Sequence, residues 1–63
     1  MSKTSGHKLD YAINHLKQER SRISTERDVA TNNKDYDLAS ELDWIVNGLN
    51  AAINLLEDKR SES

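Results

Sequence analysis

The chain has 63 residues, of which 35% are hydrophobic and 32% charged, and it contains no cysteine and no proline. These numbers exclude a disulfide scaffold and a thiolate zinc site, and the composition is too apolar for disorder and too polar for a membrane span. A chain of this size buries only about 60% of its unfolded surface. We therefore expect one small domain that gains stability by self-association. The amino terminus lacks the apolar stretch of a signal peptide, and we expect a cytoplasmic protein.

Charge is distributed unevenly along the chain, although the net charge is only −2. Residues 1–34 hold seven basic and four acidic residues, a net +3, whereas residues 35–58 hold six acidic residues and no basic one, a net −6. A basic first half and an acidic second half favour pairing between the two halves, within one chain or between chains.

The first predicted element is a helix over about residues 6–31. Its apolar residues recur every seven positions, which is the spacing of a helix that packs along one face. Ser5 is the expected N-cap. The apolar positions are Leu9, Leu16, Ile23 and Ala30, with Ala12 and Ile13 beside them.

A short turn over about residues 32–34 and a second helix over about 35–60 follow, with frayed termini. Asn32 and Asn33 tolerate the left-handed conformation that ends helices, and so short a turn makes the two helices antiparallel. The second helix has its own apolar seam of residues spaced four and three apart: Leu38, Leu42, Ile45, Leu49, Ala52 and Leu56. Matching the seams pairs Leu9 with Leu56, Leu16 with Leu49, and Ile23 with Leu42. The predicted fold is an all-α antiparallel hairpin.

A second apolar strip runs along the other side of the second helix. At about 100° per residue, Trp44 points nearly opposite the seam, in line with Gly48, Ala51 and Leu55. One partner helix cannot cover both sides, so we expect two hairpins to form a dimeric four-helix bundle. Either this strip or the flank made by Val46 and Ile53 would then be buried between chains. The plain alternative is a half-exposed tryptophan and a tolerated glycine.

Near the turn, the seam of the first helix becomes charged. Arg20 and Arg27 stand where the second helix offers apolar residues. Their aliphatic stems could pack while the charged groups reach water. Alternatively, this end opens onto another chain, and the arginines pair with acids such as Asp43 or Glu41.

No catalytic or cofactor motif is visible, and the sequence predicts no enzyme, no bound metal and no cofactor. His15 lies one turn from Tyr11, with Lys8 and Arg22 on the same outer strip, which is typical of a charged helix surface. The basic face of the first helix favours a second hypothesis, a nucleic-acid-binding regulator whose affinity would fall steeply with salt. Interleaved acids and the acidic second helix argue against it.

Two short stretches resemble known helical hairpins. Asp35-Tyr36-Asp37-Leu38-Ala39-Ser40-Glu41-Leu42 resembles the Asp-Phe-Glu-x-Ala-Ala-x-Leu core of UVR hairpins, which dimerise or dock on partner proteins. The Arg-Asp pair expected next is replaced by Asp43-Trp44, and the upstream methionine is absent. Ser40-Glu41-Leu42-Asp43 is similar to the Ser-Gln-Glu-Leu-Asp motif of sporulation-phosphatase hairpins, without its glutamine.

As a whole, the chain resembles a small early protein from the exo–xis region of lambdoid bacteriophages. The resemblance rests on its length, on Lys8-Leu9-Asp10-Tyr11-Ala12-Ile13-Asn14-His15-Leu16 and on Leu42-Asp43-Trp44-Ile45. It implies a helical, dimeric, non-enzymatic protein in the cytoplasm of the infected host. Such a protein would bind a host or phage protein and modulate host physiology or the balance between lysis and lysogeny. The resemblance assigns no functional residues.

Overall fold

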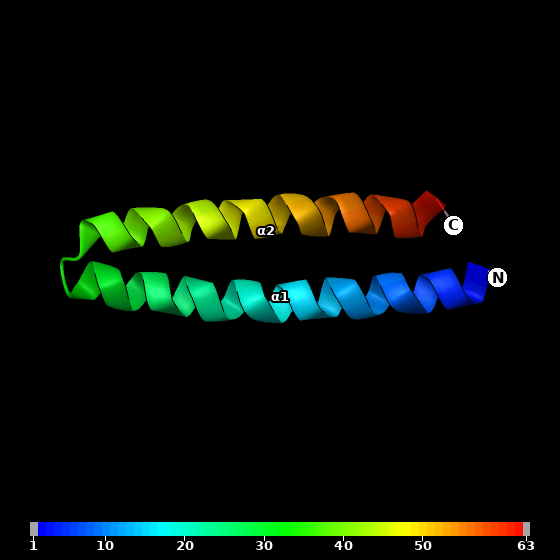
Figure 1. Ribbon diagram of the computed structural model, residues 1–63, viewed down its shortest axis with the longest axis horizontal. Coiled ribbons are helices and arrows are strands. Elements are labelled where there is room, and N and C mark those ends of the chain that lie inside the picture. The colour runs from blue at the N-terminus through cyan, green and yellow to red at the C-terminus, as the bar shows by residue number, and fades with distance from the viewer. Residues whose placement is uncertain (1, 63) are drawn as a thin grey trace.

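The molecule is an antiparallel pair of long helices. The structure, a computed structural model, describes residues 2–62, and the side chains of residues 7–62. Helix α1 spans Ser2–Asn32 and helix α2 spans Tyr36–Glu62. They lie side by side along a rod of 49 × 14 × 10 Å, with the start of α1 and the end of α2 at the pole opposite the turn (Figure 1). The predicted all-α hairpin is confirmed.

Both helices are longer than the sequence pattern predicts. α1 begins at Ser2, so Ser5 lies within the helix instead of capping it. α2 continues to Glu62, through residues that were expected to fray. The chain has no proline, the residue that most strongly stops a helix, so neither end meets a strong breaker.

A left-handed residue closes α1, and it is Lys34, with a φ angle of 63°. The Asp35 amide donates to the Ala30 carbonyl at 2.8 Å and the Lys34 amide donates to the Thr31 carbonyl at 3.0 Å. This pair of bonds is the Schellman arrangement, which satisfies the last carbonyls of a helix. The turn chemistry predicted one of the asparagines in this conformation. The helix runs one or two residues further than asparagine preference alone suggests, and the lysine takes the left-handed position.

Asp35 begins α2. Its carboxylate Oδ1 accepts the Leu38 amide at 3.4 Å, which satisfies one of the free amides of the first turn. The aspartate also places a negative charge at the positive end of the helix dipole. The turn therefore ends one helix and starts the next within three residues.

Six apolar side chains form the buried core between the helices. Ile13 and Ile53 are the most deeply buried, at 1% and 2% exposure. Ile23 and Leu42 belong to one buried cluster near the turn, as their predicted pairing requires. The full set is Ile13, Ile23, Ala30, Leu42, Val46 and Ile53.

The inward side of α2 differs from the predicted seam in three positions. Leu42, Leu49 and Leu56 face α1 as predicted, but Ala39, Val46 and Ile53 take the places of Leu38, Ile45 and Ala52. Both sets are spaced four and three apart, so periodicity alone does not separate them. The observed rotation buries Ile53 in place of Ala52 but Ala39 in place of Leu38, so the size of the buried side chains does not favour it over the predicted one.

Candidate functional site

The side of α2 that faces away from α1 carries an exposed apolar strip. We call Trp44, Gly48, Ala51 and Leu55 the Trp44 strip; all four are exposed. Trp44 is 76% exposed and Leu55 is 67% exposed. The hairpin alone therefore leaves its tryptophan, the residue type most enriched in interface hot spots, almost fully in water.

Gly48 lies one turn from Trp44 in the middle of this strip. A Cβ atom built at Gly48 would meet no other atom within 4 Å. Packing within the hairpin therefore gives no reason for a glycine, which destabilises a helix interior by roughly 1 kcal/mol relative to alanine. The backbone at this point is open to close approach from outside.

The alternative interface flank, Val46 and Ile53, is contradicted. Both side chains are in the hairpin's own core, at 8% and 2% exposure. They point toward α1 because the helix is rotated further than the predicted seam implied. They have no surface left for a second chain.

The same rotation exposes two residues that were predicted to be buried. Leu38 and Ile45 are 43% and 47% exposed. They lie seven residues apart on one side of α2, between the Trp44 strip and the core. The exposed apolar surface is therefore broader than the strip alone.

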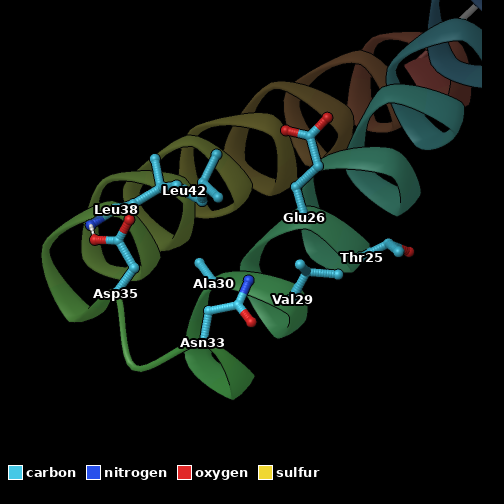
Figure 2. A pocket seen from close by; sticks show the side chains of 8 residues that line it. All are labelled: Thr25, Glu26, Val29, Ala30, Asn33, Asp35, Leu38 and Leu42. Atoms are coloured by element: carbon cyan, nitrogen blue, oxygen red, sulfur yellow. Dashed lines mark hydrogen bonds between the residues drawn. The ribbon is translucent and has the colours of Figure 1, made fainter.

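At the turn, this surface continues into a groove of about 320 Å³ between the two helices. Figure 2 shows Val29 and Ala30 of α1 and Leu38 and Leu42 of α2 around it, with Asp35 at the turn. Val29 is half-exposed. The sequence pattern did not predict this groove. A valine next to a seam alanine was the available indication, because a small seam residue leaves space beside a larger neighbour.

A polar flank runs along α2 beside the core, on the side away from Leu38 and Ile45, and its residues bond to α1. Arg27 Nη1 donates to Asp43 Oδ1 at 2.7 Å, and Arg20 Nη1 donates to Asn50 Oδ1 at 2.8 Å. One turn beyond, Lys17 Nζ lies 3.3 Å from Glu57 Oε2. The α2 partners recur every seven residues and form a continuous polar flank.

These contacts decide the role of the two seam arginines. Arg20 and Arg27 are half-buried, so their stems pack in the seam while their guanidinium groups reach α2 of the same chain. Arg27 does pair with Asp43, as one hypothesis predicted, but within the hairpin. These bonds occupy the groups that the alternative hypothesis assigned to another chain.

The outer surface of α1 is organised by charge. Arg22 lies 2.6 Å from Glu19 and 2.9 Å from Glu26. The Arg22 hydrogen bond lowers the pKa of the Glu19 carboxyl, and the Glu19 bond raises the pKa of Arg22. At the far end, Arg60 Nη1 donates to Asp10 at 2.8 Å, which raises the pKa of Arg60.

A shallow hollow of about 280 Å³ lies on the same surface, lined by Tyr11, Asn14, His15 and Gln18. All four residues are exposed and come from one helix. Nothing in this group holds a nucleophile against a base, so it offers no catalytic arrangement.

Within residues 2–62, no group of three or more His, Cys, Asp and Glu residues is placed to hold a metal ion. Neither helix, over the part that the structure describes, is long and apolar enough to cross a membrane.

Comparison with known proteins gives no further assignment. No protein family, no curated protein and no solved structure matches the chain.

Proposed function

We propose that this chain is a non-enzymatic protein-interaction module that works through the outward side of α2. A second copy of the chain is one partner, giving a dimeric four-helix assembly. The observation that carries the proposal is the exposure of Trp44 and Leu55, next to Leu38 and Ile45, on a hairpin that buries only six apolar side chains among residues 7–62. Contiguous apolar surface of this kind marks interaction sites on small soluble proteins.

The resemblance to early proteins of lambdoid phages supplies a setting for this proposal. In that setting, the module would bind a host or phage protein in the infected cell and shift host physiology or the balance between lysis and lysogeny. The use of exposed apolar side chains fits such binding, because buried aromatic anchors carry much of the energy of protein interfaces.

The alternative, a nucleic-acid-binding regulator, depends on free positive charge along α1. Lys17, Arg22 and Arg27 each lie within 4 Å of a carboxylate of the same chain. Phosphate binding would have to break these pairs, which disfavours this hypothesis. DNA binding that weakens steeply between 50 and 200 mM salt, an approximate range over which phosphate contacts are strongly screened, would support it.

Replacing Trp44 with alanine tests the proposed surface. Sedimentation equilibrium should show a dimer for the wild-type chain at micromolar to submillimolar concentration and a shift toward monomer for Trp44→Ala. Circular dichroism of concentrated samples should show almost unchanged helix content, because Trp44 makes little contact within the hairpin. Tyr11→Ala is the matched control, since Tyr11 is an equally exposed aromatic residue on α1.

A wild-type chain that stays monomeric throughout this range would remove the dimer. Equal loss of helix content and association in Trp44→Ala would mean that Trp44 stabilises the hairpin itself and does not form an interface. Binding of a host or phage protein is tested separately, by cross-linking capture from infected cells with wild type, Trp44→Ala and Tyr11→Ala.

A further inference from the structure

The Trp44 strip has an internal symmetry. Its residues are spaced four, three and four apart, so the strip has the same spacing when α2 is reversed. Large side chains, Trp44 and Leu55, stand at its two ends, and small residues, Gly48 and Ala51, stand in the middle. A surface that matches its own reverse is what a two-fold symmetric interface requires.

We propose that the second copy binds antiparallel along α2, about a two-fold axis that passes between Gly48 and Ala51. Trp44 then packs beside the partner's Leu55, and Gly48 faces the partner's Ala51. The small central pair lets the two helices approach closely, which explains a glycine that the hairpin itself does not need. This arrangement rests on the proposed self-association and specifies its geometry. α1 lies on the outside of each half.

Charges next to the strip fit the same arrangement. Glu41 and Lys59 are 18 residues apart, which is five helical turns, so they lie on one side of the strip about 27 Å from each other. The two-fold axis brings Glu41 level with the partner's Lys59 and, by symmetry, Lys59 level with the partner's Glu41.

Asp58 lies on the other side of the strip from Glu41 and comes level with the partner's Ser40. The antiparallel arrangement therefore avoids placing these two acids together. In a parallel pair, one side of the strip would instead face the other side, so Glu41 would come beside the partner's Ser40 and Asp58 beside the partner's Lys59. Charge complementarity thus fits a second copy, the reversible spacing of the strip favours the antiparallel orientation, and the pairing of Glu41 instead of Asp58 with Lys59 distinguishes it from a parallel pair.

The contact is short. A helix pair that touches from Glu41 to Lys59 is about 27 Å long, which places the interface at the low end of the size range for specific complexes. We therefore expect a dissociation constant in the micromolar range.

Charge exchange between Glu41 and Lys59 tests the geometry. Sedimentation equilibrium at low salt measures the dissociation constants of Glu41→Lys, Lys59→Glu and the double variant. Each single variant should raise the dissociation constant about 3- to 10-fold, and the double variant should return to within about twofold of wild type. The two positions are too far apart in one chain to interact, so rescue reports a contact between chains.

Net charge gives the opposite expectation and supplies a control. Glu41→Lys takes the net charge from −2 to zero, as does Asp58→Lys on the other side of the strip. If general repulsion set the affinity, both variants would dimerise more tightly than wild type. The proposed pairing requires Glu41→Lys to weaken the dimer and Asp58→Lys not to weaken it.

A second measurement reads the direction of the helices. The chain has no cysteine, so Gly48→Cys and Ala51→Cys chains can be mixed in a redox buffer and their disulfides counted. The antiparallel dimer should form mostly the mixed disulfide, because Gly48 faces the partner's Ala51 within disulfide reach. Mostly like-with-like disulfides, or a double charge variant weaker than either single one, would overturn this geometry while leaving a Trp44-dependent dimer intact. A monomeric wild-type chain would remove both proposals.

Discussion

Two sides of α2 are equally apolar in composition and differ completely in their surroundings. The inner side, with Val46 and Ile53, is packed against α1, whereas the outer side, with Trp44 and Leu55, is in water. The polar flank explains why α2 adopts this rotation, because Asp43, Asn50 and Glu57 contact basic groups of α1. Hydrophobic content therefore does not decide which side is buried. The bonds at the edge of the seam separate the two sides.

The largest expected effect separates the two sides directly. Ile53→Ala should lower the free energy of unfolding by about 2–4 kcal/mol, because it leaves a cavity in a small core. Leu55→Ala, the matched outer-side variant, should change it by less than about 0.5 kcal/mol in a dilute monomeric sample. Urea unfolding followed by circular dichroism makes the measurement. Equal losses would show that the outer side is also packed within the hairpin.

A moderate effect is expected at the turn, where only the hairpin is involved. Lys34→Gly should raise the free energy of unfolding by about 0.5–1 kcal/mol, because glycine adopts the left-handed conformation without the steric cost that lysine bears. The dimer dissociation constant should stay the same, since the Trp44 strip is unaffected. Thermal unfolding and sedimentation of one sample test both points. A lower melting temperature would mean that the lysine side chain stabilises the turn.

The smallest effect concerns the charged outer surface of α1. The Arg22 hydrogen bond lowers the pKa of Glu19, so this pair stabilises the fold above the unfolded-state pKa of the glutamate. That contribution is lost as the pH falls through the lower, folded-state pKa. Arg22→Gln should move the Glu19 pKa up toward its ordinary value in an NMR titration. An unchanged titration would show that the pair does not persist in solution.

The sequence predicted the hairpin because the period of seven and the short turn are local properties of each segment. It did not predict the rotation of α2, because two apolar sets share Leu42, Leu49 and Leu56 and differ only at neighbouring positions. Exposure of Trp44 followed from its position opposite both sets. Val46, Ile53 and the groove at the turn depend on which set α1 selects, and that choice is made by contacts between helices.

Arg20 and Arg27 affect how specifically the two helices pack against each other. The two cations, half-buried beside an otherwise apolar seam, bond Asn50 and Asp43 of α2. Turning α2 about its axis until Ile45 and Ala52 entered the seam would carry both acceptors away and leave the guanidinium groups beside aliphatic side chains. Leucine at both positions should make the hairpin more stable but its packing less specific. The helices could then slip in register or exchange with those of a neighbouring chain. The arginines thus fix the orientation of α2 against α1, and with it the direction in which the outer side of α2 points.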